Sequence, residues 1–418
     1  MTEKYILEEK NLLDRIVKAV QSKGITGEEQ PIKTLTLICV GKKTKNKEPY
    51  STTAHVEDES SIGKDYLVKK LGKIVFWKDW IFFDSPSKTA VTYSQRKKEI
   101  KDEQTKEEKW IPEGIPITEQ SIVYISDATD EFLNSEDCKM LTGGDVNTQR
   151  TIDGHSVLMS WEKAVVIITS AQTSKGEQMV TRAISIKLDE TEKQTEEIKD
   201  FNLERKCGVN FKNEDGMIVE HPELVDEVKR CFYDLEEVYV DLQQVQDLIK
   251  EKIPKSRNVK MRRLSSRLYD LISFSATLHQ CNRNCIGFKS ERDENFKVIE
   301  ANEQDVDIGF AAFNASYKTD ISDLTFLNKR QTKILKRLKK ESPKQYSIAI
   351  IQTWSEAEGV SYNTLSYTDL PRIMQENPDV QIDEEKRPKT YYYAGRLEPK
   401  PATEKSTIIP EEFDIDLN

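Results

Sequence analysis

The first residues that suggest chemistry form a candidate phosphate-binding loop. Asp58, Gly63 and Lys64 fall at the spacing of the pattern G-x-x-x-x-G-K-[ST], between a strand predicted at 52–56 and a helix predicted at 64–71. Backbone amides at the start of such a helix point toward bound phosphates, and the lysine reaches the β- and γ-phosphates. The predicted nucleotide-binding residues are Ser61, Gly63, Lys64 and Asp65. The alternative is a helix N-terminus without a ligand.

Two positions depart from that pattern. Asp58 stands where glycine is usual, and aspartate tolerates the left-handed backbone angles that glycine adopts. Asp65 stands where a hydroxyl group normally meets Mg²⁺. A carboxylate also ligates Mg²⁺, but it brings another negative charge close to the triphosphate. The pattern therefore predicts nucleotide binding with Asp65 as a metal ligand, and leaves hydrolysis open.

Two predicted strands further along end in polar groups that suit phosphate chemistry. The strand predicted at 121–125 leads to Asp127, which is expected to hold Mg²⁺ directly or through a water molecule. The strand predicted at 164–169 is followed by Ser170, whose hydroxyl is expected to position the attacking water. The glutamate that usually follows the acidic residue is missing, so a core strand with an acidic turn is the alternative.

Basic residues suggest contacts to a neighbouring subunit and to nucleic acid. Arg182 precedes another predicted strand, and in a ring such an arginine can stabilise charge on a neighbour's γ-phosphate. An Asp-Gly pair at 153–154 predicts a hairpin, in which Arg150 and His155 could contact a nucleic-acid backbone. The alternatives are a surface arginine and an ordinary surface hairpin.

A metal site and a membrane segment are both poorly supported. His279, Cys281 and Cys285 could form half of a zinc site, but no second pair lies nearby. The six cysteines are irregularly spaced, which favours a reducing intracellular compartment. No apolar run approaches about 18 residues, and the N-terminus lacks a signal-peptide pattern. We therefore expect a cytoplasmic protein with no membrane contact.

The predicted elements alternate between strands and helices over the candidate site. This alternation indicates an α/β domain with a mainly parallel sheet. Residues 94–110 are nearly all charged and are expected to form an exposed loop. Residues 191–310 are predicted to be mostly helical, most clearly at 235–253 and 263–280. Strands are predicted at 52–56, 74–77, 121–125, 156–160, 164–169 and 183–188, with a final pair at 380–382 and 390–394; C-terminal helices are predicted at 329–340, 348–358 and 362–375.

The order of these features resembles an AAA+ P-loop ATPase, nearest to the minichromosome-maintenance and superfamily-three helicases. It is more closely similar to the helicase-like ATPases of archaeal and bacterial mobile elements, which are often found beside or fused to primases. The resemblance covers roughly residues 5 to 285. The matching stretches are Asn11 to Val17, Gly24 to Glu29, Ser60 to Val68, Ser87 to Tyr93, Asp189 to Thr195 and Leu271 to Gln280.

The resemblance assigns further roles. Arg182 matches the arginine finger that acts on the neighbouring subunit's nucleotide, and Arg263, or alternatively Arg267, matches the second sensor arginine. The C-terminal part is similar to a winged helix, which can bind DNA or only partner proteins. Its candidate DNA contacts lie in the wing and are Lys386, Arg387 and Lys389. The implied domains are an N-terminal helical segment (1–50), a P-loop AAA+ core (51–200), a helical lid-like segment (201–310), a winged helix (311–397) and an acidic tail (398–418).

The expected function is ATP-driven DNA unwinding or remodelling by a homo-oligomeric ring, a hexamer, with ATP and Mg²⁺ as cofactors. The resemblance implies a role in replication of a mobile element or virus, nucleoid association, an archaeal, bacterial or viral origin, and a primase or initiator as a candidate partner. One alternative is a degenerate, non-hydrolysing protein that acts on DNA as an initiator, regulator or adaptor. Another is a loader or remodeller that acts on proteins.

Charge is distributed unevenly along the 418 residues. The formal net charge is −10, which excludes a uniformly basic nucleic-acid coat. Acidic residues gather in predicted loops, after Asp189 and in the tail. Basic residues gather at 41–47, 255–263, 329–340 and 386–389. Local basic surfaces on an acidic exterior are compatible with DNA binding that weakens strongly with salt.

Overall fold

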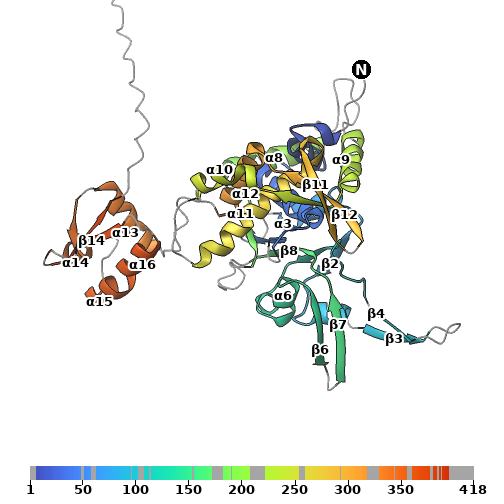
Figure 1. The fold of residues 1–418 in the computed structure, drawn as a ribbon, viewed down its shortest axis with the longest axis horizontal. Helices are drawn as coiled ribbons and strands as arrows, with labels where there is room; N and C mark the ends of the chain where they lie inside the picture. The colour runs from blue at the N-terminus through green and yellow to red at the C-terminus, as the bar shows by residue number, and fades with distance from the viewer. Residues whose placement is uncertain are drawn as a thin grey trace, which may run out of the picture. The chain divides into compact units, whose positions relative to one another are not determined.

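The chain, described here from a computed structural model, divides into two compact units (Figure 1). The first contains Met1–Pro254 and Val259–Leu324, and the second contains Lys255–Asn258 and Thr325–Asn418. The predicted boundary at residue 311 falls inside α12 (Glu303–Tyr317), which belongs to the first unit. The structure describes residues 6–48, 51–57, 63–95, 97–101, 108–112, 114–152, 155–171, 182–189, 191–207, 222–253, 259–291, 293–317, 329–342, 344–354, 360–376, 380–383, 386 and 388–394.

Five parallel strands form the central sheet of the first unit. They are β1 (Thr53–Glu57), β2 (Trp80–Asp84), β5 (Ile122–Ser126), β8 (Val165–Ser170) and β9 (Ile184–Ile186). Their order is β2-β5-β8-β1-β9, and every neighbouring pair is parallel. The predicted α/β domain with a mainly parallel sheet is therefore confirmed.

The strand predicted at 74–77 is wrong, because the chain turns there. Phe76 adopts a left-handed backbone angle, with φ of 46°. The carbonyl of Val75 accepts a hydrogen bond of 2.8 Å from the indole Nε1 of Trp80. The edge strand β2 begins only at Trp80, after this turn. An apolar run of four residues is thus a turn, in which Ile74, Val75 and Phe76 are buried without pairing in the sheet and Trp77 is exposed.

Different helices cover the two faces of the sheet. On one face, α4 (Ala90–Ser94), α5 (Asp130–Leu133) and α6 (Glu136–Leu141) share an apolar core with alternate residues of β5 and β8. On the other face lies α3 (Lys64–Gly72), and α2 (Glu29–Val40) packs against α3 and β1. Because side chains alternate between the two faces along a strand, the choice of face decides which polar groups meet the start of α3.

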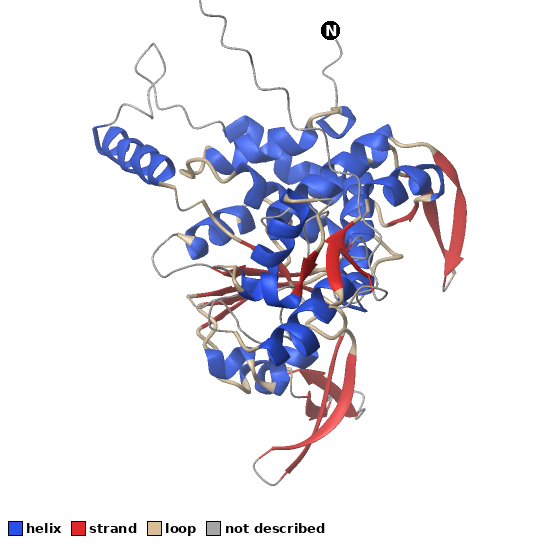
Figure 2. Cartoon of the chain, turned by 90° about the vertical axis from the view of Figure 1, so that its left-hand side faces the viewer, coloured by secondary structure: helices blue, strands red, loops and turns tan. Residues whose placement is uncertain are grey.

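Two antiparallel hairpins project from the first unit (Figures 1 and 2). One pairs β3 (Lys97–Lys101) with β4 (Glu108–Pro112), and the other pairs β6 (Val146–Ile152) with β7 (His155–Trp161). The second hairpin confirms the prediction made from the Asp-Gly pair. The first lies in the charged stretch that was predicted to be a loop. Antiparallel pairing satisfies backbone hydrogen bonds whatever the side-chain charge, so the charge pattern did not reveal it.

Helices and a second, small sheet follow the central sheet. Strands β10 (Val238–Asp241), β11 (Cys285–Glu291) and β12 (Glu294–Glu300) lie in the order β10-β12-β11. The helix predicted at 235–253 is therefore wrong in its first half, because short apolar runs have no period that separates strand from helix. The other helices are α1 (Leu12–Gln21), α8 (Glu192–Cys207), α9 (Pro222–Asp234), α10 (Gln246–Lys252) and α11 (Val259–Leu278), with 3-10 turns at Ile6–Glu8, Gly41–Lys43, Gln243–Val245 and Gln280–Asn282.

The second unit is a small mixed structure around its own apolar core. Its elements are α13 (Lys329–Lys340), β13 (Tyr346–Ser347), α14 (Ile348–Gln352), α15 (Tyr362–Thr364), a π-helical turn (Leu365–Asp369), α16 (Leu370–Glu376), β14 (Val380–Asp383) and β15 (Thr390–Tyr393). The strands form a three-stranded antiparallel sheet in the order β13-β15-β14. Ile334, Leu335 and Leu338 of α13 are buried in the core. The predicted basic helix and the final strand pair are confirmed.

Candidate nucleotide-binding site

The candidate site lies where the direction of the chain through the sheet reverses. From β1 the chain passes through α3 to β2 at the far edge, whereas the neighbouring strand β8 leads to β9 on the other side of β1. Ligands of open α/β sheets bind outside the carboxyl ends of the strands at such a switch point. Gly63 precedes α3 with φ of 84°, and a Cβ added there would meet no described atom within 4 Å.

A single hydroxyl group joins the two acidic residues predicted as metal ligands. The Oδ1 of Asp65 accepts hydrogen bonds from Tyr124 Oη at 2.6 Å and from Thr169 Oγ1 at 2.5 Å. The same Thr169 hydroxyl accepts a bond from the backbone N–H of Asp127 at 3.1 Å. Lys64, the first residue of α3, is 6% exposed at this place. The structure therefore brings Gly63, Lys64, Asp65 and Asp127 together.

Tyr124 acts as a hydrogen-bond donor in this arrangement. Burial raises the pKa of its phenol, and the neighbouring Asp65 carboxylate raises it further. The phenol therefore keeps its proton at neutral pH and donates a hydrogen bond to Asp65. Sequence reasoning missed Tyr124 because it treated the strand at 121–125 as wholly apolar. The available signal was the alternation of side chains, which sets Tyr124 on the sheet face of α3.

Ser170 lies on the wrong face of the sheet to meet α3. Its Oγ is buried and lies 2.9 Å from Nε2 of His55, which is itself buried on β1. Thr169, one residue earlier, faces α3 and contacts Asp65. Successive residues of a strand point to opposite faces, so only one of the two hydroxyls that end β8 can serve the site. The predicted water-positioning role therefore fits Thr169 and not Ser170.

Asp127 is held by its backbone at the end of β5. Its φ of 46° is left-handed, a conformation that costs free energy for a residue other than glycine. The N–H groups of Asp127 and of the following Ala128 both bond to Thr169, the second to its carbonyl at 2.8 Å. One residue earlier, the hydroxyl of Ser126 donates to Asp84 at the end of β2. The Asp127 side chain is exposed at this turn.

The residues present fit a bound Mg²⁺ only in part. Oδ1 of Asp65 already accepts two hydroxyl donors, while Oδ2 lies 3.7 Å from the ammonium of Lys69. In the part of the chain that the structure describes, no group of three or more His, Cys, Asp or Glu side chains is arranged to hold a metal. Asp65 Oδ2 and the Asp127 carboxylate are the two acidic groups that this place offers to a metal ion.

Arg182 and Arg267 lie at the amino ends of the strands, whereas the candidate site lies at their carboxyl ends. Arg182 precedes β9, so it lies at the amino end of a strand whose neighbour β1 carries the site at its carboxyl end. Its Nη1 donates to the carbonyl of Lys139 at 3.0 Å. Arg267 is 1% exposed and donates to the carbonyl of Ala183 at 2.9 Å, also before β9. Neither side chain can reach the site of its own chain. Arg263 lies in α11, but its side chain is outside the described residues.

The predicted nucleic-acid residues are described only in part. The β6–β7 hairpin pairs Ile152 with His155, but the side chains of Arg150 and His155 lie outside the described residues, as do Ser61 and Arg387. Lys386 and Lys389 are exposed between β14 and β15. The Lys386 ammonium lies 3.5 Å from a carboxylate oxygen of Asp383 and also donates to Gln345.

The basic stretch at 41–47 is an internal network and not a binding surface. Lys42 is 1% exposed; its ammonium lies 2.5 Å from Asp79 Oδ2 and 2.6 Å from the carbonyl of Gln120. Burial lowers the pKa of Lys42, and the bond to Asp79 opposes that effect. Lys45 pairs with Glu237 at 3.1 Å. The predicted basic surface is therefore wrong for Lys42, Lys45 and Lys47, whose ammonium groups are held by acidic partners and carbonyls, whereas Lys43 is only partly buried.

The candidate zinc ligands are not gathered around a common point. His279 is buried, whereas Cys281 and Cys285 are exposed. No protein-family model matches the chain, and no curated protein sequence matches it. Among the described helices, none has both the length and the apolar character required to cross a membrane.

Proposed function

We propose that the first unit is a P-loop ATPase domain of the AAA+ type. The observation that carries the proposal is the strand order. Since β8 lies between β1 and β5, the hydroxyl of its Thr169 lies between Asp65 of α3 and Asp127, the acidic residue after β5. A group that positions an attacking water needs this location. The order of Lys64, Asp127 and Thr169 along the chain supports the same reading.

In this proposal each group has a distinct task. Lys64 and the amides at the start of α3 hold the β- and γ-phosphates. Asp127 and Oδ2 of Asp65 hold Mg²⁺, which neutralises charge on the phosphates when it is bound. The Thr169 hydroxyl, fixed by Asp65 and by the Asp127 amide, orients the water. Fixed donors and acceptors of this kind stabilise charge that develops in the transition state.

The position of Arg182 supports assembly into a ring. Arg182 lies at the amino end of β9, and Lys64 follows the carboxyl end of the neighbouring β1. We therefore assign Arg182 no role at the site of its own chain. In a head-to-tail ring this end of the sheet faces the next subunit's nucleotide, where a guanidinium can stabilise transition-state charge. A ring would also bring the β6–β7 hairpins of all subunits around one axis, where each could follow a DNA strand.

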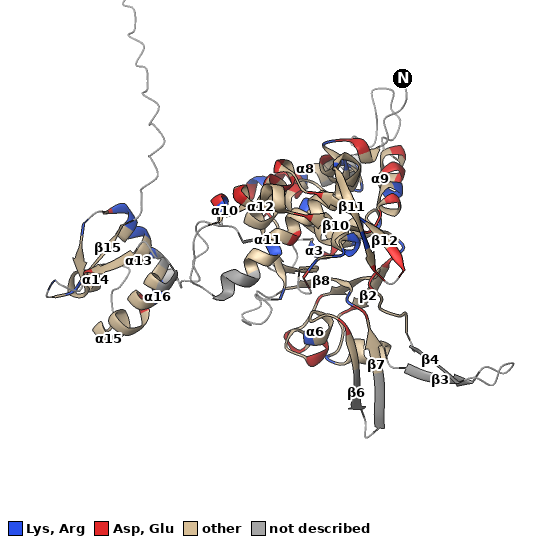
Figure 3. Ribbon diagram, viewed as in Figure 1, with Lys and Arg blue, Asp and Glu red and all other residues tan. Residues whose placement is uncertain are grey.

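The second unit supports DNA as the substrate. A winged helix consists of a small helical core with a strand pair that forms the wing, and β14 and β15 are such a pair. Lys and Arg colour much of α13 in Figure 3, and Lys333, Lys336 and Lys340 are exposed on it. Exposed lysines at a spacing of three or four residues share one helix face and can bind a phosphate backbone. We therefore propose ATP-driven DNA unwinding or remodelling.

A second candidate function is a nucleotide-binding protein that does not hydrolyse ATP. The observation that favours it is the Asp65 carboxylate, which occupies the position of the metal-binding hydroxyl and is itself bonded to Tyr124 and Thr169. Its charge opposes the triphosphate, and no glutamate follows Asp127. Such a protein would hold the second unit on DNA as an initiator, regulator or adaptor.

The two candidates are separated by comparing nucleotide binding with turnover. Wild-type protein is assayed for binding of a fluorescent ATP analogue, for ATP hydrolysis with and without single-stranded DNA, and for displacement of a strand from forked DNA. Lys64→Ala should abolish all three. Lys73→Ala, an exposed lysine just beyond α3, is the matched control and should abolish none. Binding without turnover supports the second candidate, and unwinding that survives Lys64→Ala refutes the ATPase proposal.

A further inference from the structure

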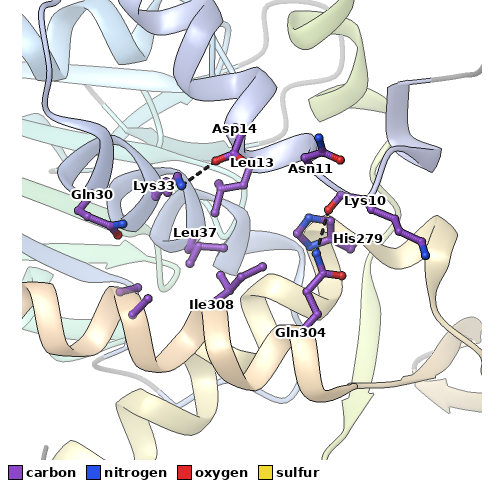
Figure 4. Close-up of a pocket in the computed structure, with 12 residues that line it drawn as sticks. Lys10, Asn11, Leu13, Asp14, Gln30, Lys33, Leu37, His279, Gln304 and Ile308 are labelled. Atoms are coloured by element: carbon purple, nitrogen blue, oxygen red, sulfur yellow. Dashed lines mark hydrogen bonds and ion pairs between the residues drawn. The ribbon is translucent and has the colours of Figure 1, made fainter. Parts of the chain in front are cut away.

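Lysines of the first unit pair closely with acidic side chains, also at places apart from the candidate nucleotide site. Figure 4 shows one example at the border of a cavity of about 330 Å³, where the Lys33 ammonium lies 2.7 Å from a carboxylate oxygen of Asp14. In the small sheet, the Lys297 ammonium lies 2.6 Å from a carboxylate oxygen of Glu236. A row of exposed lysines without such partners is therefore notable, and α13 of the second unit carries one.

The lysine face of α13 consists of Lys333, Lys336 and Lys340. All three are exposed, and residues three and four positions apart lie on one side of a helix. None of them forms an ion pair with an acidic side chain in the part of the chain that the structure describes. Arg337 differs, because its Nε lies 3.0 Å from Oε1 of Glu341. The face therefore concentrates positive charge on a helix that has no acidic residue of its own.

The sequence beyond the second unit carries the opposite charge. Residues 406–418 include four acidic residues and no lysine or arginine. They lie outside the described residues, and we call positions 411–416 the acidic segment. Apolar residues at 413, 415 and 417 alternate with acidic residues at 412, 414 and 416. The charge of this segment complements the lysine face, and its four acids are Glu411, Glu412, Asp414 and Asp416.

The last described residues of the second unit lie beside α13. The hydroxyl of Ser342, just beyond the helix, donates to the carbonyl of Tyr393 at 2.9 Å. The Lys339 ammonium lies 5.5 Å from the centroid of the Tyr393 ring. Glu411 follows Ala394, the last described residue, by 17 residues, and 17 residues span up to about 56 Å. Because α13 is only about 18 Å long, the acidic segment can reach each of its exposed lysines.

The charges of the two segments also have similar spacings. Helix residues three and four positions apart are separated by about 4.5 and 6 Å along the axis. Alternate residues of an extended segment are separated by about 6.7 Å. A single exposed ion pair contributes little. Several pairs on one tethered segment act together, because the tether keeps the acids at a high effective concentration near the lysines.

We propose that the acidic segment binds the lysine face of α13 in the same molecule. Carboxylates and phosphates both offer anionic oxygens to an ammonium group, so the segment and a DNA backbone compete for the same lysines. The contact depends only on this chain, whereas its effect on DNA rests on the proposed function. An occupancy of about four-fifths lowers the apparent affinity for DNA about fivefold.

Lysine acetylation of the full-length protein tests the contact without DNA. A limiting amount of the N-hydroxysuccinimide ester of acetic acid is added at about 50 mM salt, where exposed charges are weakly screened. Mass spectrometry then gives the rate at each lysine. An ammonium held by a carboxylate reacts more slowly, because only the free amine is a nucleophile.

Two variants with the same change in net charge are compared with the wild-type protein. The segment variant carries Glu411→Gln, Glu412→Gln, Asp414→Asn and Asp416→Asn. The control variant neutralises four exposed acids of α8 in the first unit, and carries Glu192→Gln, Glu196→Gln, Glu197→Gln and Asp200→Asn. A difference between the variants therefore reports the position of the acids and not the total charge.

The lysine face should be acetylated about fivefold faster in the segment variant than in the wild-type protein. Lys73, exposed in the first unit, should react equally in both. The control variant should match the wild-type protein, and the difference should fade at about 0.5 M salt. Equal rates on the lysine face in the two variants would overturn the proposal. Protection that grows with protein concentration would also overturn it, because the segment would then come from another molecule.

Binding of forked DNA to the same three proteins separates this inference from the proposed function. The segment variant should bind about fivefold more tightly than the control variant. Tighter binding without faster acetylation of the lysine face would overturn the inference. If acetylation differs as expected and none of the three proteins binds DNA, the contact is supported and the proposed DNA function fails.

Discussion

The hydrogen bonds that converge on Asp65 give a measurable prediction for the start of α3. Tyr124→Phe removes one of the two hydroxyl donors to Oδ1 and changes little else in shape. A hydrogen bond to a charged group contributes about 1.5–3 kcal/mol, and the side chain of Asp65 is 26% exposed, so water replaces part of the loss. We therefore expect α3 to be destabilised by about 2 kcal/mol.

Hydrogen exchange of the amides in α3 measures this change in the full-length protein. A loss of about 2 kcal/mol corresponds to roughly 30-fold faster exchange where closing is fast and the opening equilibrium sets the exchange rate. Tyr66→Phe is the matched control, since Tyr66 lies on the same helix and its hydroxyl makes only a bond of 3.5 Å to the carbonyl of Lys23. We expect that control to change exchange by less than threefold.

The second donor makes the test sharper. Thr169→Val alone should act like Tyr124→Phe, but the double variant leaves Oδ1 of Asp65 without either hydroxyl. The loss of α3 stability in the double variant should therefore exceed the sum of the losses in the two single variants by about 1 kcal/mol. The reasoning is refuted if the α3 amides exchange no faster in Tyr124→Phe than in Tyr66→Phe. It is also refuted if the stability losses of the two single variants are simply additive in the double variant.

Three further predictions concern buried and exposed charges. Burial raises the pKa of Asp270 to about 6 from an ordinary value of 3.8; the folded state therefore takes up this proton first, so its contribution to stability rises by about 2 kcal/mol as the pH falls from 6 to 4. Asp270→Asn should remove that part of the pH dependence in urea unfolding. Lys42→Met should lower the free energy of unfolding by about 3 kcal/mol by leaving a carboxylate without its ammonium partner, whereas Lys43→Met should change it little. Lys336→Ala should weaken DNA binding and lower its salt slope by about 1, while Lys45→Ala leaves both unchanged; equal effects of the two variants would contradict the assignment of α13.

The parts of the site that sequence predicted are those that depend on local order. The Gly63-Lys64 pair lies between a strand and a helix, and both elements are as predicted. Asp127 follows a run of five buried residues, which has the length of a strand in a parallel sheet. Neighbours along the chain determine these features, so a pattern of a few residues is enough to predict them.

The errors arise where the partner of a segment decides its structure. Ser170 and Thr169 are equivalent in sequence, and only the packing of α3 on one face of the sheet separates their roles. Residues 238–241 form a strand because β12 pairs with them, although their composition also suits a helix. The charged stretch after residue 96 contains strands for the same reason. Pairing over long sequence distances leaves no local signal.

Charge clusters are the hardest feature to interpret from sequence, and the correction of one cluster changes where the proposed DNA contact is expected. Both the 41–47 stretch and α13 are rich in lysine, but Lys42 is enclosed by Asp79 and a carbonyl, whereas Lys333, Lys336 and Lys340 are exposed. With the first cluster excluded, the basic residues left for DNA in the described chain lie mainly in the second unit. For the proposed DNA-binding function we therefore expect the second unit to make the first contact with DNA, because the net charge of the whole chain is −10 and opposes a phosphate backbone elsewhere.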